Sequence, residues 1–335
     1  MTSAILLRMP TVSSRVSILI VSWNGADLLS KCVQSFTQAT ADLPQIVVVD
    51  NGSTPPLAPL PNTTWIRSET NLGFAGGNNL GLPHCTGEYL LLLNNDTQLT
   101  DLRTIETLVT FLDEHPRVAI AQAKLIRPDG NLDTCGEFLT PLGVLYHHGY
   151  GLPDGPHAQT AFPVYAAKAA CCLIRTSALA DVGGILFQDA YFCYGEDLEL
   201  CHRLWLANWE IWFVPTPPVL HLECATSSKL ASRFVWSHYL SNLLTTACHY
   251  WSPTLWFRLG GGLLLLLIAG GLLKGVWPRR RAGLPPFRRR RDDRDLLKHV
   301  LVSIPFSYLF QCLTRRFHWL APRLPHQNDD SNVDF

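Results

Sequence analysis

The sequence predicts an α/β fold, with a mostly parallel sheet flanked by helices and a C-terminal helical segment that associates with a membrane. Two observations predict the sheet: apolar runs without alternation, and helical patterns between those runs. Strands that are buried on both faces of a parallel sheet have this pattern, because neither face contacts water. With 335 residues, of which 47% are hydrophobic, the chain is long enough for one large domain and an appendage.

Three apolar runs are the first predicted strands, and each ends in polar, turn-forming residues. The runs are residues 16–22, 46–49 and 88–93, and their polar ends are residues 22–24, 50–53 and 94–97. Open α/β sheets bind ligands outside the carboxyl ends of their strands. We therefore expect the three polar ends to form one binding crevice.

The remaining elements alternate between helix and strand, with one irregular region among them. Helices are expected over residues 26–36, 103–115, 176–182 and 196–207, and strands over 117–123, 171–174 and 211–214. Residues 126–161 contain several glycines and prolines and are predicted to be irregular and exposed, as regions that select an acceptor often are.

A change in composition near residues 252–253 marks the main domain boundary. The predicted parts are an N-terminal extension (1–15), a catalytic domain (16–252), a helical membrane-associated segment with a polybasic tract (253–320) and a polar tail (321–335). Residues 1–15 lack the apolar core of a secretory signal. The catalytic part is therefore expected in the cytoplasm.

The charges are distributed unevenly, although the formal net charge is zero. Residues 1–273 hold 14 basic and 21 acidic residues, whereas residues 274–316 hold 12 basic and three acidic residues. Such a basic tract attracts a polyanion, either an anionic lipid surface or a nucleic acid. Without interleaved aromatic residues or a recognised nucleic-acid module, the tract is predicted to bind an anionic membrane surface and no nucleic acid.

The apolar stretch at residues 259–273 contains 15 uncharged residues, fewer than the ~20 that span a bilayer. Residues 255–277 are long enough to cross, but a crossing would place the arginines opposite a cytoplasmic domain, against the positive-inside rule. With a second apolar stretch at 299–313, the pattern favours a peripheral or re-entrant anchor on the cytoplasmic side. A soluble helical hairpin is the open alternative.

The ten cysteines are scattered, without a CxxC pair or a framework spacing. In a chain of this size they are expected to be reduced. Cys171 and Cys172 lie in an apolar run, which favours burial over metal ligation.

Five motifs in a fixed order resemble those of family 2 glycosyltransferases, most closely the rhamnosyltransferase-like branch. The motifs are Val-Ser-Trp-Asn-Gly at 21–25, Val-Val-Asp-Asn-Gly-Ser at 48–53, Asn-Leu-Gly-Phe-Ala-Gly-Gly-Asn-Asn at 71–79, Leu-Asn-Asn-Asp-Thr at 93–97 and Tyr-Gly-Glu-Asp at 194–197. The likeness covers roughly residues 16–225. It implies a GT-A fold, which is Rossmann-like, and a nucleotide-sugar donor, either a dTDP- or a UDP-sugar.

The resemblance assigns donor binding to the first three motifs and to part of the fourth. It implies that Asp50 accepts the imino N–H of a pyrimidine base, although an Asx turn would place an aspartate there without that role. Glycines at 73–77 let backbone approach the donor, and Asn78 and Asn79 either cap a helix or touch the diphosphate. The expected donor-binding residues are Ser22, Asn24, Asp50, Asn51, Asn71, Gly76, Gly77, Asn78 and Asn95.

A divalent cation, Mg²⁺ or Mn²⁺, is expected beside the fourth motif. The resemblance places Asn94 where the family has the first carboxylate of its metal motif, so Asp96 is the remaining charged ligand. One carboxylate plus two donor phosphates is enough to hold such a cation. His221 resembles the late histidine that completes this site, although a lone histidine is often structural.

The fifth motif supplies the expected catalytic residues. The resemblance implies that Asp197 is the general base that deprotonates the acceptor, with Glu196 positioning the acceptor or supporting the base. Carboxylates are also ordinary residues in the first turn of a helix, where they favour the helix dipole.

Together these features predict an inverting, metal-dependent transferase. The donor is expected to be dTDP-rhamnose by resemblance, and the acceptor a hydroxyl of a glycan or lipid-linked glycan in cell-envelope polysaccharide assembly. The alternative is a non-catalytic nucleotide-sugar-binding scaffold subunit, because Asn94 occupies the metal motif.

Overall fold

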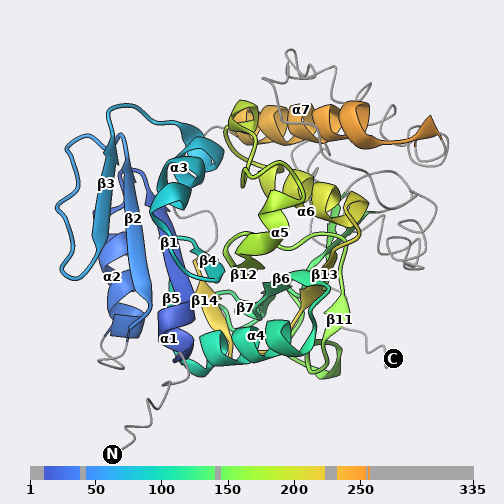
Figure 1. Cartoon of the computed structure of the whole chain (residues 1–335), viewed down its shortest axis with the longest axis horizontal. Coiled ribbons are helices and arrows are strands. Elements are labelled where there is room, and N and C mark those ends of the chain that lie inside the picture. Colours follow the sequence, from blue (N-terminus) through green and yellow to red (C-terminus); the bar gives the residue numbers. More distant parts are fainter. Residues whose placement is uncertain (1–10, 38–42, 140–144, 223–231, 254–255, 257–335) are drawn as a thin grey trace, which may run out of the picture.

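The computed structural model describes residues 11–37, 43–139, 145–222, 232–253 and 256, and its centre is an eight-stranded mixed sheet (Figure 1). In order across the sheet, the strands are β11 (Phe162–Pro163), β13 (Glu210–Phe213), β6 (Val118–Gln122), β12 (Cys171–Arg175), β4 (Tyr89–Leu93), β1 (Val16–Ser22), β2 (Gln45–Asn51) and β3 (Thr64–Ser68).

Strands β4, β1, β2 and β3 are parallel, as expected from the continuous apolar runs. All five residues of β4 are buried, and both faces of β1 are covered, which explains why these runs show no alternation. Strand β12 was expected from its apolar sequence, but it runs antiparallel to both β4 and β6. Its residues Cys171 and Cys172 are buried, and the described cysteines form no disulfide.

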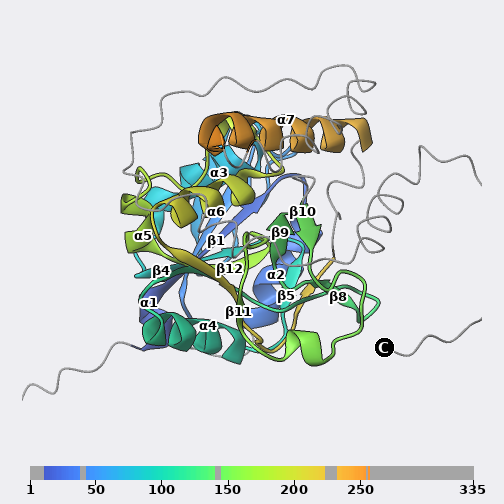
Figure 2. The ribbon, with the colours of Figure 1, turned by 90° about the vertical axis from the view of Figure 1, so that its right-hand side faces the viewer.

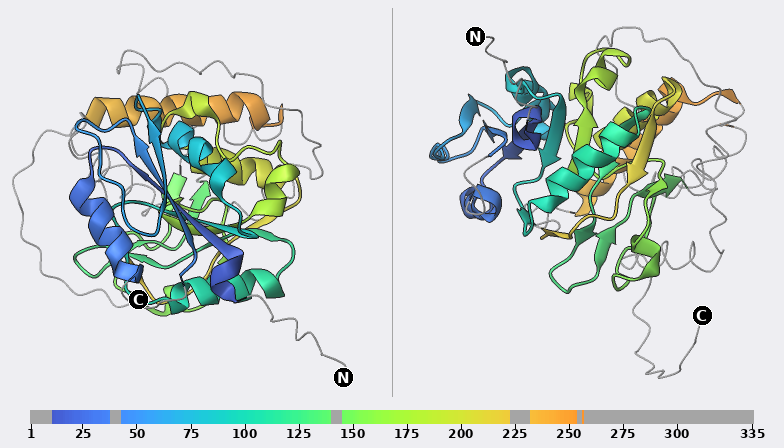
Figure 3. Two further views of the ribbon diagram at one scale, coloured as in Figure 1. Left: turned by 60° about the vertical axis from the view of Figure 1, so that its left-hand side comes forward. Right: turned by 60° about the horizontal axis from the view of Figure 1, so that its bottom comes forward.

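Helices cover both faces of the sheet (Figure 3). One core cluster packs α2 and α4 against the sheet, and the other packs α3, α5, α6 and α7 against the opposite face. The helices are α1 (Val12–Arg15), α2 (Ala26–Thr37), α3 (Gly73–Gly81), α4 (Arg103–Glu114), α5 (Thr176–Ala180), α6 (Glu196–Leu206) and α7 (Ser232–Tyr250), with 3₁₀ turns at Leu82–His84, Pro156–Ala158 and Asp189–Tyr191.

The glycine-rich segment was expected to be a loop, but it forms helix α3 itself. The reason is close packing: a Cβ atom at Gly77 would lie 2.7 Å from the side chain of Val21, and one at Gly81 would lie 2.4 Å from Leu19. Both distances are shorter than real Cβ contacts, so these glycines allow α3 to lie directly on β1.

The region at 126–161, expected to be irregular, contains short strands (Figure 2). Residues 125–126 pair with residues 219–220, whereas the other strand pairs of this region join segments that are close in sequence. Strands of two or three residues are too short to show a period. Strands β5 (Thr97–Leu99), β14 (Val219–His221), β7 (Leu125–Ile126) and β8 (Leu132–Thr134) form a four-stranded sheet, and β9 (Glu137–Leu139) pairs with β10 (Leu145–His147).

The structure describes only small parts of the segments that were predicted to flank the catalytic domain. Residues 12–15, the end of the predicted N-terminal extension, form α1, and Arg15 pairs with Glu88 and Asp113. The expected membrane segment at 253–320 lies outside the described residues except for residues 253 and 256, and the tail at 321–335 lies outside them entirely. Within the described ranges, no helix has both the length and the apolar character needed to cross a membrane.

Candidate active site

A pocket of about 880 Å³ lies where β1, β2 and β4 end and where several loops meet. Elements from both halves of the chain line it, including the start of α3, strands β9, β10 and β14, the start of α6, and α7. The position matches the expectation that the polar strand ends form one crevice, because the carboxyl ends of parallel strands share an edge of the sheet.

The pocket brings together seven of the thirteen residues that the sequence singled out. Those that line it are Asn51, Asn71, Asn95, Asp96, Glu196, Asp197 and His221. Those that do not line it are Ser22, Asn24, Asp50, Gly76, Gly77 and Asn78. The expected meeting of carboxylates therefore holds for Asp96 and Asp197, and Asp50 stands apart.

Asp50 is fully buried and makes its contacts away from the pocket. Its carboxylate accepts hydrogen bonds from the backbone N–H groups of Ser53 and Leu57 and pairs with Arg67, which lies opposite it on β3. Burial alone would raise the pKa of Asp50, but these donors hold it below its usual value. The carboxylate thus binds the backbone of the turn that follows β2, although not as an Asx turn, since the N–H group of Ser53 is three residues on. Arg67 is its charged partner.

The other residues outside the pocket support its walls. The Ser22 hydroxyl accepts a hydrogen bond from Asn95 at 2.9 Å. The side chain of Asn24 accepts from the N–H of Thr54. Asn78 donates to the carbonyl oxygen of Phe74 within α3, and Gly76 and Gly77 are buried in the same helix. These polar residues of the motifs therefore have hydrogen-bond partners within the protein, and a ligand is not needed to explain their presence.

Asp96 and His221 approach each other in the pocket, as expected for two ligands of one cation. His221 Nε2 lies 3.4 Å from Asp96 Oδ1, and its other ring nitrogen lies 2.7 Å from the carboxylate of Asp133. An outer carboxylate of this kind fixes the orientation of a ligand histidine. The side-chain oxygen of Asn94, which lines the same pocket, is buried and has no hydrogen-bond partner among the described residues.

These residues fit a hard divalent cation, which prefers oxygen ligands and accepts an imidazole nitrogen. The set is sparse, since the described residues contain no group of three or more His, Cys, Asp or Glu side chains that could hold a metal ion. Burial lowers the pKa of His221, but hydrogen bonds with Asp133 and Asp96 outweigh this effect and raise it to about 9. A cation would therefore have to displace a proton from Nε2.

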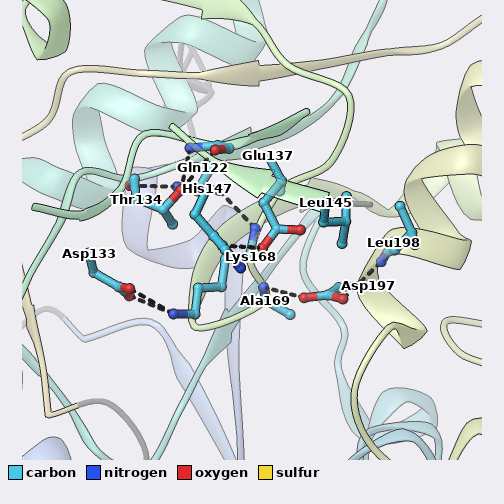
Figure 4. A network of polar contacts seen from close by, with 12 residues as sticks. Gln122, Asp133, Thr134, Glu137, Leu145, His147, Lys168, Ala169, Asp197 and Leu198 are labelled. Atoms are coloured by element: carbon cyan, nitrogen blue, oxygen red, sulfur yellow. Dashed lines mark hydrogen bonds and ion pairs between the residues drawn. The ribbon is translucent and has the colours of Figure 1, made fainter. Parts of the chain in front are cut away.

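Asp133 and Lys168 were not predicted from the sequence. Asp133 is fully buried on β8, and Lys168 Nζ contacts both of its oxygens at 2.8 Å (Figure 4). Burial would raise the pKa of Asp133, but Lys168 and His221 hold it well below its usual range. Asp133 is therefore a fixed negative charge behind His221. The only sequence signal was its place in the region assigned to acceptor selection.

Glu196 and Asp197 begin α6, directly after Gly195, whose φ of 91° is left-handed. Asp197 accepts hydrogen bonds from the N–H groups of Leu198 and Ala169, at 2.8 and 3.4 Å. Burial raises the pKa of Asp197 to about 7, with a further rise from the charge of Glu137. Burial raises the pKa of Glu196 even more, with help from Asp197. Both carboxyl groups of the pair therefore keep their protons to a higher pH than free carboxyl groups do.

Glu137 and His147 form a second pair in the pocket that sequence reasoning missed. His147 Nδ1 lies 2.8 Å from Glu137 Oε1, and the side chain of Glu137 is only 4% exposed. The two residues lie on the paired strands β9 and β10, in register with each other. Their functional meaning is not visible in sequence because the pairing is formed only in the fold.

Comparison with known proteins identifies relatives in glycan synthesis. Residues 17–138 match the model described as glycosyl transferase family 2. The chain is 26% identical over 281 residues to the N-acetylglucosaminyl-diphospho-decaprenol L-rhamnosyltransferase of Mycobacterium tuberculosis, covering 74% of this chain and 90% of that protein. It is also 26% identical over 227 residues to the O-antigen biosynthesis protein RfbC of Myxococcus xanthus, covering 63% of this chain but 18% of that protein.

Two solved structures share the fold at low sequence identity. GalNAc-T7 with UDP, GalNAc and Mn²⁺ has a TM-score of 0.56 and 15% identity, covering 91% of this chain and 58% of that one. The mannosyltransferase PcManGT from Pyrobaculum calidifontis, in complex with GDP-Man and Mn²⁺, has a TM-score of 0.52 and 16% identity, covering 91% and 82%. The fold is therefore GT-A-like, and residues 17–138 are similar to family 2 glycosyltransferases, the family that the sequence motifs predicted.

Proposed function

We propose that this chain transfers a sugar from a nucleotide-diphosphate donor to an acceptor hydroxyl, with inversion at the anomeric carbon. One observation carries the proposal: a single pocket is lined both by the Asp96–His221 pair and by Asp197. The first two are suited to the leaving diphosphate and its cation, and the third to the attacking hydroxyl.

Asp197 is the general base of the proposed step. Its carboxylate takes the proton of the acceptor hydroxyl while the hydroxyl oxygen forms a bond to the anomeric carbon. The bond from that carbon to the diphosphate oxygen breaks, and its electron pair leaves on the diphosphate. One displacement of this kind inverts the carbon. A pKa of about 7 suits a base that works near neutral pH.

We propose that Asp96, His221 and the side-chain oxygen of Asn94 hold Mg²⁺ or Mn²⁺ together with the donor phosphates. The bound cation would neutralise the charge that develops on the leaving diphosphate. Asp133 would keep His221 in the orientation that presents Nε2, through its 2.7 Å contact with Nδ1. Asn51, Asn71 and Asn95 line the same pocket and are the proposed donor contacts.

We propose dTDP-rhamnose as the donor and a lipid-linked glycan of cell-envelope polysaccharide assembly as the acceptor. The mycobacterial relative supports this choice, because its name specifies L-rhamnosyl transfer to N-acetylglucosaminyl-diphospho-decaprenol. We propose that the enzyme meets this acceptor at the cytoplasmic face of a membrane, in a peripheral or re-entrant position.

The test is transfer of labelled rhamnose from dTDP-rhamnose to a synthetic N-acetylglucosaminyl-diphospho-polyprenol, with and without Mn²⁺. Asp197→Asn is expected to bind donor normally and to lose about 10² to 10⁴ in kcat, the usual contribution of a positioned general base. Glu88→Gln, at the amino end of β4, is the matched control. Near-normal turnover by Asp197→Asn would contradict the assignment of the base.

A scaffold that binds nucleotide sugar without turnover is the second candidate, favoured by one residue. Asn94 stands at a position where the metal motif of the family has a carboxylate. This reading predicts donor binding by the wild-type chain with neither transfer nor Mn²⁺-dependent donor hydrolysis, so the same assay separates the two functions.

A further inference from the structure

The Glu137–His147 pair is a charged element of the pocket that the proposed step leaves without a role. Both residues line the pocket together with Asp197. In Figure 4 the carboxylates of Glu137 and Asp197 lie near each other, whereas Lys168 points the other way, toward Asp133. Glu137 thus lies on the side of the general base and away from the Asp133 contact behind His221.

Backbone hydrogen bonds hold Glu137 in place. Its N–H donates to the carbonyl oxygen of Ala166, and its own carbonyl accepts from the N–H groups of Tyr165 and Ala166. Gly136 precedes it with a φ of 101°, and a Cβ atom there would lie 2.4 Å from Val164. Strand β9 is therefore fixed by backbone contacts.

The carboxylate of Glu137 has an electrostatic cost in this pocket. Two carboxylates that share a poorly solvated pocket repel each other, and the charge of Glu137 disfavours ionisation of Asp197. A buried ion pair often contributes little net stability, because desolvation offsets the attraction between the charges. His147 orients the Glu137 carboxylate from β10, and this leaves an oriented group beside the base.

We propose that Glu137, oriented by His147, is an acceptor-positioning residue that binds a second hydroxyl of the acceptor sugar, next to the hydroxyl that Asp197 deprotonates. The inference rests on the proposed function and deepens it, because it makes a diol of the acceptor the recognised feature. A carboxylate accepts hydrogen bonds from hydroxyl groups, so one acceptor hydroxyl donates to Asp197 and its neighbour to Glu137.

Two further features of the pocket suit a sugar acceptor. Glu196 lines it with a side-chain oxygen that is buried and has no hydrogen-bond partner in the described part of the chain. As a protonated acid, it can donate to an ether or hydroxyl oxygen of the acceptor. Tyr150 is 37% exposed and lines the same pocket, so its ring offers an apolar face to the C–H bonds of a sugar.

The test combines variants with acceptor analogues. Wild type, Glu137→Gln and Glu137→Asp are assayed with the synthetic N-acetylglucosaminyl-diphospho-polyprenol and with its monodeoxy analogues. We expect Glu137→Gln to lower kcat/KM for the parent acceptor roughly 10- to 100-fold, as loss of a charge-assisted hydrogen bond does. The Kd for dTDP-rhamnose with Mn²⁺ stays unchanged, and Glu137→Asp recovers part of the loss.

Non-additivity is the decisive result. With the wild-type enzyme, one monodeoxy analogue is expected to lower kcat/KM as much as Glu137→Gln does with the parent acceptor. With Glu137→Gln, the same analogue should lower kcat/KM little further, because the same contact is already missing. Glu88→Gln is the matched control, since Glu88 pairs with Arg15 outside the pocket. Glu88→Gln should show the wild-type kcat/KM for the parent acceptor and for each analogue.

The outcomes separate the inference from the proposed function. If wild type rhamnosylates the acceptor and every analogue shows the same ratio of wild-type to Glu137→Gln rates, Glu137 makes no acceptor contact and the inference is overturned. If wild type transfers nothing, the proposed function itself fails and the inference falls with it. Should Glu137→Gln fail to fold, judged by donor binding, His147→Gln gives the same comparison from the other partner of the pair.

Discussion

Asp197 is surrounded by groups that change its pKa in opposite directions. Burial and the charge of Glu137 raise the pKa, whereas Lys168 and the N–H groups of Leu198 and Ala169 lower it. The balance gives a value of about 7. A value of about 7 suits the general-base role that is proposed for Asp197.

The pH dependence of turnover follows from this value. Only the ionised form of Asp197 accepts a proton, so kcat/KM should fall as the pH falls through about 7, with the slope of a single proton. Removing the charge of Glu137 lowers the pKa of Asp197, so the acid limb of Glu137→Gln should move to lower pH. The measurement is kcat/KM for the lipid-linked acceptor from pH 5 to 9. An acid limb at the same pH in both enzymes would show that the charge of Glu137 does not change the pKa of Asp197.

The sequence allowed the base to be chosen but not its surroundings. The family resemblance led to Asp197 as the proposed base, and the helix start expected at Glu196 is confirmed, because α6 begins there. Asp133, Glu137 and Lys168 come from three other segments, and their contacts exist only after β8, β9 and β12 are in place. Asp50 shows the converse case: the motif was recognised, but Arg67 on the next strand determines where its carboxylate points.

At the scale of elements, α7 holds the loop that precedes the catalytic pair. The side-chain amide of Asn242 donates to the carbonyl oxygens of Tyr191, Cys193 and Tyr194, at 2.8, 3.0 and 2.7 Å. In that loop Phe192 and Tyr194 have φ values of 59° and 66°. Non-glycine residues rarely adopt such left-handed values, so the loop needs an external partner to keep this shape.

Asn242→Ala should therefore disturb catalysis more than donor binding. Loss of buried hydrogen bonds is expected to lower the free energy of unfolding by about 1 to 3 kcal/mol. A small displacement of Asp197 should also lower kcat by roughly 10-fold or more. Donor Kd should stay near wild type, because the contacts of Asn242 are to the loop before α6. Ser241→Ala, a buried neighbour on the same helix, is the control. Equal losses in kcat and donor affinity would indicate general unfolding instead of a positioning role.

The elements that the sequence predicted well are those with a strong local pattern. Strand β1 and the first residues of α2, α4 and α6 agree with expectation because a long apolar run or an amphipathic period marks them. The short strands β7 to β10 are only two or three residues long, and α3 is helical despite its glycines because it packs closely on β1. Tertiary contacts decide such segments, and periodicity does not reveal them.

At the scale of the whole molecule, the pocket and the basic tract that is proposed to bind lipid lie in different parts of the sequence. The described residues contain the pocket, and the basic tract at 274–316 lies beyond them. Arginine-rich segments bind anionic lipid by electrostatic attraction, which salt screens over a Debye length of about 10 Å at 0.1 M. Apolar stretches beside such a tract bury side chains in the lipid, and salt does not weaken this contribution to binding.

A chain that ends after Trp256 should therefore lose lipid binding but keep its donor site. It retains Trp251, which is buried and contacts the ring of Trp256 at 5.4 Å, so the end of the described core is preserved. We expect full-length protein to sediment with vesicles that contain phosphatidylglycerol, less so at 1 M NaCl, and weakly with pure phosphatidylcholine. The truncated chain should stay in the supernatant and bind dTDP-rhamnose with Mn²⁺ as the full chain does. Equal sedimentation of both chains would instead place the lipid-binding surface within residues 1–256, and the basic tract would need another polyanion as its partner.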